Sequence, residues 1–315
     1  MKIVFLGSGK FGIDCIEAIA ESNNQIKLVV TSPPNPAGRG QKQKPTPVAQ
    51  WAKQNNIKTI ETDNVNTPEM IKSLASFEPD LVVVIAFGQK ISNDLIAIPP
   101  KGAINVHASL LPKYRGAAPI NFPVINGDTQ TGVTIITLAE KMDAGKMLAR
   151  AKTDIAPDED AGQLHDRLAK IAAPLLLETI DKIAAGTAEY IEQDHSKATL
   201  APKLKKSDGI LDFTDSAIAI ERKIRGLWPW PKATAAYTSK KTGKTINVAI
   251  AKAKVVETTS NLAPGTLDEN LNIVCGTDAL EILQIKPAGR QLQSFKDFLN
   301  GQHCQPDDLF KKIEL

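Results

Sequence analysis

MKIVFLGSGKFG, residues 1–12, places a short apolar run directly before three glycines spaced Gly7-x-Gly9-x-x-Gly12. The apolar run predicts a strand over Lys2–Leu6, and the residues after the glycines predict a helix over about Lys10–Glu21. A glycine-rich turn between a strand and a helix lets the chain reverse tightly and can bring backbone N–H groups to a phosphate. The stretch therefore predicts the first strand, turn and helix of a doubly wound α/β sheet.

The glycine pattern alone does not identify a dinucleotide site. A dinucleotide-binding domain also needs an acidic residue at the end of its second strand, where it holds a ribose hydroxyl. The predicted second strand, Gln25–Val30, runs instead into Thr31-Ser32-Pro33-Pro34. We therefore interpret the glycines as a tight turn and expect no NAD(P). An NAD(P)-dependent reductase remains an alternative, and a titration with a nicotinamide cofactor would show whether the protein binds one.

Strand and helix patterns alternate through the first half of the chain. Asp80–Ala86 is a nearly continuous β-branched run, typical of a strand buried on both faces. Ala103–Val106 predicts another strand, and Thr46-Pro47 predicts a helix start through an N-cap followed by proline. Gly132–Leu138 and Lys146–Ile155 predict a strand pair that returns at the sheet edge. The predicted fold class is α/β, with a Rossmann-like, doubly wound, mainly parallel sheet.

The pattern changes after a helix predicted over Gln163–Ala185, which Gly186 ends. Short strand patterns then follow, separated by turn residues, with one helix predicted over Ala217–Gly226. The predicted strands are Ile210–Phe213, Ala233–Tyr237, Thr245–Ala251, Leu271–Val274 and Leu280–Ile285. We predict a Rossmann-like catalytic domain over residues 1–189, a linker over 190–207 and a small OB-like β-barrel domain over 208–315.

Composition limits the class of protein. The 315 residues are 42% hydrophobic and 23% charged with a formal net charge of +3, which is ordinary for a globular protein. Cys15, Cys275 and Cys304 form no C-x-x-C pair, so the pattern indicates neither a disulfide framework nor a zinc site, and we expect no metal. The chain shows no signal-peptide pattern and no apolar run of membrane-spanning length. We therefore expect a cytoplasmic protein without a membrane partner.

The densest polar cluster lies at the end of the strand predicted over Ala103–Val106. Asn105 and His107 are two residues apart on extended chain, so their side chains point to one side, at the end where open α/β sheets bind ligands. An amide N–H can hold a developing oxyanion, and a histidine can relay a proton. Asp143, in the turn Glu140–Gly145, is the candidate carboxylate partner. These residue types indicate an acyl-type transfer site, whereas a strand cap, a structural histidine and a turn aspartate are the alternatives.

Asn105-x-His107-x-Ser109-Leu-Leu-Pro112, with Asp143-x-Gly145 downstream, resembles the active-site signature of the 10-formyltetrahydrofolate-dependent formyltransferases. The resemblance covers nearly the whole chain and includes Ser109–Ile120, Ala201–Leu204, Trp228–Pro231 and Ile285–Gly301. It implies that a formyl group passes from 10-formyltetrahydrofolate, the donor substrate, to the α-amino group of methionine on initiator tRNA, for translation initiation. It also implies that Asn105 holds the oxyanion with help from His107, and that Asp143 accepts the amine proton and orients His107.

The resemblance further implies where the substrates bind. The folate is expected against Phe87, Gly88, Gln89, Ser109, Leu110, Leu111 and Pro112. The loop Pro33–Val48 resembles the segment that enters the tRNA acceptor stem, which implies that Arg39, Lys42 and Lys44 bind tRNA. Residues 201–256 contain twelve Lys and Arg against four Asp and Glu, so we predict a barrel with a basic face for a nucleic-acid backbone.

Three alternatives to this interpretation stay open. A formyltransferase for a small amine, such as a nucleotide-linked amino sugar, would use the same Asn105, His107 and Asp143 without needing a basic barrel. The basic face could also be an ordinary solvated surface. A non-catalytic RNA-binding module would leave the three polar residues without a use, and any formyl transfer would exclude it.

Overall fold

A computed structural model describes residues 1–37 and 42–313, without the side chains of 35–37 and 42. Two compact units make up the chain. The first contains Met1–Pro119, Gln130–Asp154 and His165–Pro202, and the second contains Ile120–Thr129, Ile155–Leu164 and the residues from Lys203 onward. None of the helices in the described residues combines the length and the apolar character that crossing a membrane requires.

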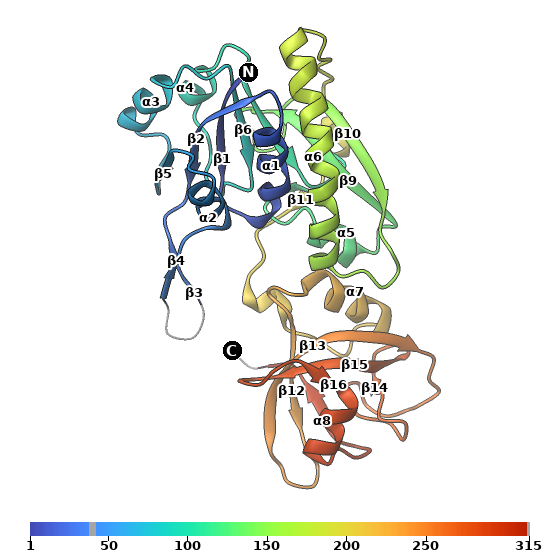
Figure 1. Ribbon diagram of the computed structural model, residues 1–315. Coiled ribbons are helices and arrows are strands. Elements are labelled where there is room, and N and C mark those ends of the chain that lie inside the picture. Colours follow the sequence, from blue (N-terminus) through green and yellow to red (C-terminus); the bar gives the residue numbers. More distant parts are fainter. Residues whose placement is uncertain (38–41, 314–315) are drawn as a thin grey trace. The chain divides into compact units, whose positions relative to one another are not determined.

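A seven-stranded sheet forms the centre of the first unit, in the order β10-β9-β7-β6-β1-β2-β5 (Figure 1). Its strands are β1 (Lys2–Gly7), β2 (Gln25–Thr31), β5 (Thr59–Glu61), β6 (Leu81–Ile85), β7 (Ala103–His107), β9 (Gln130–Thr137) and β10 (Met147–Asp154). The strands β5, β2, β1, β6 and β7 run parallel, whereas β9 is antiparallel to β7 and β10 is antiparallel to β9. The predicted mainly parallel sheet with an edge return is confirmed.

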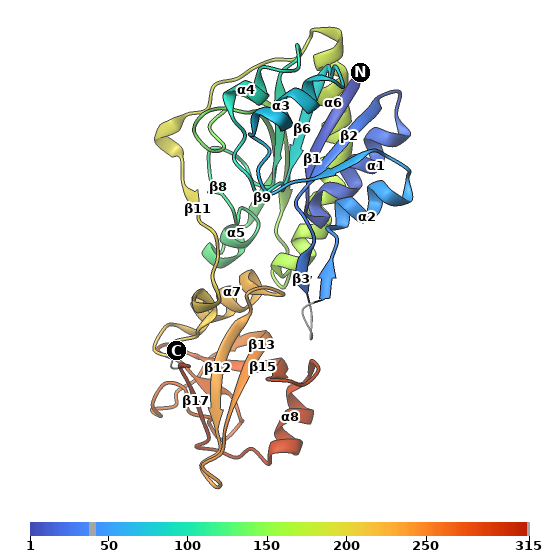
Figure 2. The same ribbon diagram turned by 90° about the vertical axis from the view of Figure 1, so that its left-hand side faces the viewer.

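Helices cover both faces of this sheet. They are α1 (Ile13–Glu21), which follows the short 3₁₀ turn η1 (Lys10–Gly12), and α2 (Pro47–Gln54), α3 (Pro68–Ala75), α4 (Asn93–Ile96) and α6 (Ala161–Ala185). Figure 2 shows α1 and α2 on one side of the sheet and α3 and α4 on the other. Leu74 of α3 and Leu95 of α4 pack into one core with alternate residues of β1, β2 and β6. The sheet is therefore doubly wound, as the alternating pattern predicts.

The three opening glycines form the tight strand-to-helix turn predicted for them. A β-carbon on Gly7 would lie 2.6 Å from the Phe5 ring and 2.8 Å from the carbonyl oxygen of Ile85 in the neighbouring strand. At the end of β2, the Ser32 backbone N–H donates to Ser8 Oγ at 3.0 Å, so hydroxyl groups join the two strand ends. No side chain larger than hydrogen fits at Gly7 unless the strands move apart. The absence of NAD(P) stays a prediction.

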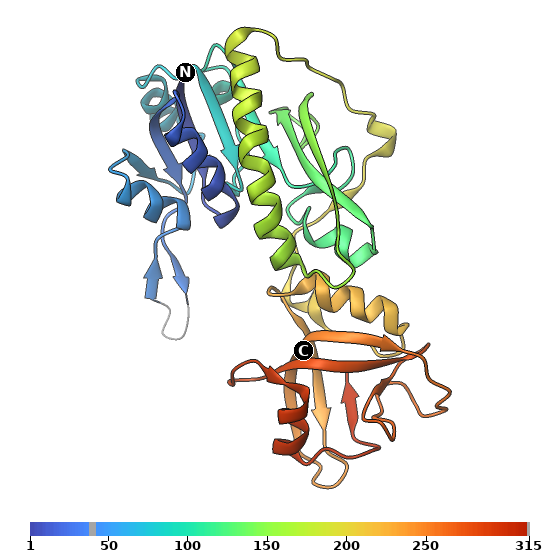
Figure 3. The same ribbon diagram turned by 45° about the vertical axis from the view of Figure 1, so that its right-hand side comes forward.

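The second unit is built on a nearly closed antiparallel barrel, in the order β14-β15-β13-β12-β17 with β16 beside β15 (Figure 3). Its strands are β12 (Ala233–Thr238), β13 (Thr245–Val256), β14 (Ile273–Val274), β15 (Ala279–Pro287), β16 (Gln293–Ser294) and β17 (Leu309–Lys311). Isolated bridges from Leu267 to Ile273 and from Thr266 to Leu309 connect the two ends of this order. The small C-terminal β-barrel predicted from sequence is confirmed.

Three α-helices lie entirely within the described residues of this unit: α5 (Asn121–Asn126), α7 (Ala217–Leu227) and α8 (Phe295–Gln302). Ile220 and Ile224 of α7 and Phe298 of α8 lie in the barrel core. Within residues 208–315 we predict a single helix, and this prediction was incomplete, because α8 was missed. The local signal for α8 is Ser294, whose hydroxyl caps the helix by accepting from the Asp297 backbone N–H at 3.1 Å.

Two predicted barrel strands differ from the structure. Ile210–Phe213 forms no strand: Ile210 makes one isolated bridge to Thr234, and the Asp212 carboxylate accepts from the Thr214 N–H in a turn. Its apolar alternation reflects core packing, because the Leu211 and Phe213 side chains are buried among the barrel residues. Only Ile273–Val274 of the predicted Leu271–Val274 is a strand, since Leu271 adopts a positive φ of 61°.

Candidate active site

Strand β7 carries two of the predicted catalytic side chains. Asn105 lies between Val84 of β6 and Ile136 of β9, and His107 lies opposite Thr134 of β9. His107 is 4% exposed. The two residues thus sit where the parallel part of the sheet meets its antiparallel edge, at the carboxyl end of β7.

The turn between β9 and β10 brings the third residue to them. The Asp143 carboxylate places Oδ1 3.5 Å from Asn105 Nδ2, and Oδ2 3.6 Å from His107 Nδ1. Both distances exceed those of a strong hydrogen bond, but catalytic contacts are often long before substrate binds. The structure therefore places an amide, an imidazole and a carboxylate around one point, although Asp143 is remote in sequence from the other two.

The second nitrogen of His107 fixes where its proton lies. His107 Nε2 is 2.9 Å from the carbonyl oxygen of Tyr114. A carbonyl oxygen can only accept, so Nε2 must carry a proton. In the neutral imidazole the bare nitrogen, Nδ1, then faces the Asp143 carboxylate. A proton that enters this side of the site consequently finds two acceptors, Nδ1 and Oδ2, turned toward each other.

A backbone donor holds the Asp143 carboxylate in place. The Gly116 N–H donates to Asp143 Oδ2 at 2.8 Å, which is shorter than either side-chain contact of this carboxylate. Gly116 has a φ of 125°, and a β-carbon there would lie 2.5 Å from the Ala201 carbonyl oxygen. The donor can therefore approach only from a glycine at position 116.

The Asp143 turn has its own glycine requirement. Asp143 adopts a positive φ of 52°, and a β-carbon on Gly145 would lie 1.8 Å from the carbonyl oxygen of Thr137. The backbone of the turn thus runs directly against the end of β9. This contact gives a physical reason for the Asp143-x-Gly145 pattern noted in the sequence.

Residues 109–112 form the loop after β7. The Thr134 hydroxyl donates to the Ser109 carbonyl oxygen at 2.7 Å and accepts from the Leu111 N–H at 3.1 Å. The Ser109 hydroxyl donates to the Lys113 carbonyl oxygen at 2.7 Å. Leu111 packs with Ile136 and Met147. A single buried hydroxyl on β9 therefore sets the loop that we predict to meet the folate.

The other predicted folate residues follow β6. The Phe87 side chain lies in the sheet core and is 3% exposed. The Gln89 amide accepts from the Val65 N–H at 2.9 Å and donates to the Thr62 carbonyl oxygen at 2.8 Å. Because these two side chains already have structural partners, a ligand at this loop would meet its backbone. Gly88 lies between them with a φ of 81°.

The predicted acceptor-stem loop contains a short hairpin of β3 (Asn35–Ala37) and β4 (Lys42–Lys44), which pair antiparallel. Lys44 is exposed, whereas Arg39 and the side chain of Lys42 lie outside the described residues. Their proposed tRNA contacts therefore rest on the sequence.

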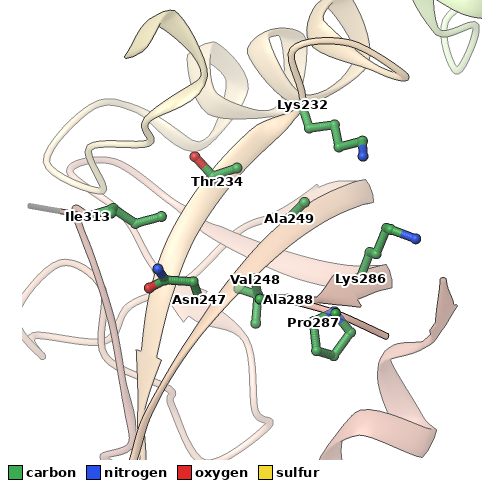
Figure 4. Close-up of a pocket in the computed structure, with 10 residues that line it drawn as sticks. Lys232, Thr234, Asn247, Val248, Ala249, Lys286, Pro287, Ala288 and Ile313 are labelled. Carbon is green, nitrogen blue, oxygen red and sulfur yellow. The ribbon is translucent and has the colours of Figure 1, made fainter. Parts of the chain in front are cut away.

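The second unit has a groove of about 250 Å³ on its barrel, shown in Figure 4. Thr234, Ala249 and Lys286 form one row across β12, β13 and β15, and Lys232 lies just before β12. The remaining lining residues are Asn247, Val248, Pro287, Ala288, Gly289 and Ile313. Lys232 and Lys286 are half-buried. Over residues 1–37 and 42–313 neither lysine makes an ion pair, so the groove presents two free cations.

Sequence reasoning missed two residues behind the Asp143 turn. Gln193 is 4% exposed, and its Nε2 donates to the Asp143 carbonyl oxygen at 2.8 Å. Arg115 donates from Nη2 to Gln193 Oε1 at 2.6 Å. Gln193 lies in the segment that we predict to be a linker, where no periodicity indicates burial. Its contact with the turn is tertiary and leaves no signal in a single sequence.

The described part of the chain contains no group of three or more His, Cys, Asp or Glu residues placed to hold a metal ion. The absence of a metal stays a prediction.

Known proteins share this architecture and sequence. The formyl transferase model matches residues 1–180, and the model of the formyl transferase C-terminal domain matches residues 203–303. A methionyl-tRNA formyltransferase of Citrifermentans bemidjiense is 39% identical and covers 99% of this chain and 97% of its own length. A methionyl-tRNA formyltransferase of Agathobacter rectalis is also 39% identical, and the match covers 98% of this chain and 99% of that protein.

Solved structures agree on the fold at lower identity. A sugar 3N-formyl transferase, WlaRD, solved with dTDP and 5-N-formyl-THF, superposes with a TM-score of 0.64 at 16% identity, covering 92% of this chain and 99% of its own. HypX from Aquifex aeolicus, solved with tetrahydrofolic acid, superposes with a TM-score of 0.61 at 15% identity. The match covers 98% of this chain and 48% of the HypX chain. From these matches, the chain belongs to the formyl transferase family, and within it to the methionyl-tRNA formyltransferases.

Proposed function

We propose that this enzyme transfers the formyl group of 10-formyltetrahydrofolate to the α-amino group of methionine esterified to initiator tRNA. The observation that carries the proposal is the 39% identity to methionyl-tRNA formyltransferases along nearly the whole chain, barrel included. The meeting of Asn105, His107 and Asp143 supports the chemistry. The sugar formyltransferases share the fold at 16% identity, which does not speak for a sugar acceptor.

The reaction needs one group for the oxygen and one for the proton. The methionine nitrogen attacks the formyl carbon, a C–N bond forms, and the carbonyl oxygen becomes an oxyanion. Asn105 Nδ2 would donate to this oxygen, because an amide N–H fixed on a strand stabilises charge without reorganising. As the intermediate collapses, the bond from carbon to folate N10 breaks and N10 must gain a proton.

The Asp143–His107 pair would carry that proton. An α-amino group has an ordinary pKa near 7.7–8.0, so the amine must lose a proton before or during attack. Asp143 Oδ2 lies 3.6 Å from His107 Nδ1, and neither atom carries a proton when Asp143 is ionised and the His107 ring is neutral. The proton removed from the amine can therefore rest between them and then pass to N10. The predicted cytoplasmic location suits this reaction.

Two features support the proposal that the methionine acceptor is carried by tRNA. The Pro33–Val48 loop presents Lys44 on a hairpin, and the barrel groove presents Lys232 and Lys286 at half-buried positions. Lysines contact phosphate oxygens without reading base sequence. We propose that the groove contacts the tRNA backbone.

A formylation assay tests the proposed function. Purified enzyme and 10-formyltetrahydrofolate are mixed with initiator tRNA charged with methionine, and formylmethionine is measured after hydrolysis of the ester. Uncharged tRNA and free methionine are the controls, and a nucleotide-linked amino sugar is the competing acceptor. Formylation of the charged tRNA supports the proposal, whereas transfer to the amino sugar alone would replace it.

Replacing Arg39 with alanine should weaken formylation of charged tRNA and leave folate binding unchanged, because a cation in this loop would contact phosphate. The measurements are KM for charged tRNA and the Kd of the folate donor. An equal loss of both would point to misfolding and count against the assignment of Arg39.

Lys232→Gln and Lys286→Gln should each raise the Kd of tRNA. Each lysine that contacts a phosphate also adds about one unit to the slope of log Kd against log salt concentration. Lys241→Gln is the matched control, because Lys241 is exposed and lies outside the groove. If all three variants had the same slope as the wild type, the groove would not bind the RNA backbone.

A further inference from the structure

Gln193 contacts the backbone of the Asp143 turn at two points. Its Nε2 donates to the Asp143 carbonyl oxygen at 2.8 Å and to the Gly145 carbonyl oxygen at 2.7 Å. The side chain is enclosed, since Gln193 is 4% exposed. A single buried amide thus joins the carbonyl of the predicted proton acceptor to the glycine two residues later.

Arg115 fixes the orientation of this amide. Its Nη2 and Nε donate to Gln193 Oε1 at 2.6 and 3.2 Å. A guanidinium can only donate and a carbonyl can only accept, so the amide oxygen must face Arg115 and the amide nitrogen must face the turn. The two ends of Gln193 therefore have unambiguous partners.

The segment that carries Gln193 is part of the first unit and is hydrogen-bonded to it on both sides of Gln193. Ile191 exchanges two backbone hydrogen bonds with Met147 at the start of β10, at 2.7 and 2.9 Å. Further on, β11 (Leu200–Ala201) pairs in parallel with β8 (Arg115–Gly116). Figure 3 shows this segment, which follows α6, returning along the edge of the sheet formed by β9 and β10. Gln193 is therefore held on both sides in the sequence.

The Asp143 turn needs such support. Asp143 has a φ of 52°, which is uncommon for a residue with a side chain, and the preceding Met142 is 66% exposed. The outer part of the turn therefore lacks packing that would hold Asp143 at its observed distances from Asn105 and His107. Gln193 supplies two hydrogen bonds on the inner side.

We infer that Gln193 is a positioning residue for Asp143, and that Arg115 acts through it. Gln193 itself contacts no substrate in this arrangement. It holds the backbone from which the carboxylate reaches His107 Nδ1 and Asn105 Nδ2. The kinetic consequence rests on the proposed function, whereas the structural consequence does not.

Gln193→Glu is the most direct test. Glutamate has the shape of glutamine and still offers an oxygen to Arg115, but it replaces the Nε2 donor to the turn with an acceptor. Gln54→Glu is the matched control, since Gln54 is exposed at the end of α2. In Gln193→Glu, kcat should fall by roughly 10- to 100-fold, the range by which activity falls at metal sites when a residue that orients a metal ligand is lost. KM for 10-formyltetrahydrofolate should stay near that of the wild type, whereas the thermal midpoint should fall because the Asp143 and Gly145 carbonyl groups lose their donor.

Two readouts separate positioning from general damage. On an Asp143→Asn background, Gln193→Glu should cause no further loss, because residues that act as one unit are not additive. At one fixed pH the NMR signals of the His107 ring, whose Nδ1 lies 3.6 Å from Asp143 Oδ2, should move in Gln193→Glu, while those of His165 and His303 keep their positions. Arg115→Lys should lower kcat and move the His107 ring signals in the same direction, by a smaller amount than Gln193→Glu does.

Three results would overturn the inference: a kcat within twofold of the wild type, a full additional loss on the Asp143→Asn background, or unmoved NMR signals of the His107 ring. The NMR measurement needs no acceptor substrate. If the wild type formylated no charged tRNA, the proposed function would fail while the NMR measurement still decided the role of Gln193.

Discussion

Asp143→Asn is expected to lower kcat for charged initiator tRNA by about 10²–10⁴-fold, the range that a positioned general base contributes. Asparagine keeps the shape of the side chain, and its amide oxygen can still accept from the Gly116 N–H that now binds Oδ2 at 2.8 Å. It cannot take a proton from the amine or share one with His107. The fold should therefore survive while the proton path is lost.

The experiment measures kcat, KM for both substrates and the thermal midpoint of unfolding. Asp181→Asn is the control, because Asp181 is exposed on α6. Wild-type turnover in Asp143→Asn would remove the carboxylate from the mechanism. A parallel fall in kcat and thermal midpoint would mean that the turn, and not the proton transfer, had been disturbed.

Asn105→Ala is expected to reduce kcat by about 10²–10³-fold, as loss of one oxyanion donor does. Asn105 lies on β7 between β6 and β9, so its backbone pairing does not depend on the side chain. The truncation removes the amide that now lies 3.5 Å from Asp143 Oδ1, without burying an unpaired charge. Folate binding should change little, because the donor acts on an oxygen whose charge develops in the transition state.

The matching control is Asn23→Ala, since Asn23 is exposed and far from β7 in the sequence. The informative comparison is kcat against the Kd of 10-formyltetrahydrofolate, measured separately. An Asn105→Ala enzyme that loses folate affinity but keeps kcat would assign Asn105 to ground-state binding. That result would refute its role at the oxyanion.

The sequence predicts the sheet well because its strands carry local signals. Each of these signals lies within a few residues: the buried run at 81–85, the glycine turn after β1 and the cap at Thr46. The barrel is harder. Leu211 and Phe213 alternate like a strand because they are buried, and burial alone does not distinguish a core turn from a paired strand.

The candidate site also combines features that local sequence predicts with features that depend on tertiary contacts. Asn105 and His107 share a strand, so their common direction follows from the two-residue period. Their meeting with Asp143 depends on how β9 and β10 return, and the contacts of Gln193 and Arg115 depend on a still more distant segment. No rule of spacing predicts such contacts from one chain, whereas the family resemblance does supply Asp143.

The return of residues 191–201 to the β9–β10 edge also has a consequence during synthesis on the ribosome. The Asp143 turn is made well before the segment that supports it, and Ala201, whose strand pairs with Arg115–Gly116, follows later still. At about 5–20 residues per second, several seconds separate the synthesis of Asp143 from that of Gln193. On the inferred role of Gln193, a nascent polypeptide that has emerged only as far as α6 holds Asn105, His107 and Asp143 without this support, and we expect formyl transfer only after residue 193 has emerged.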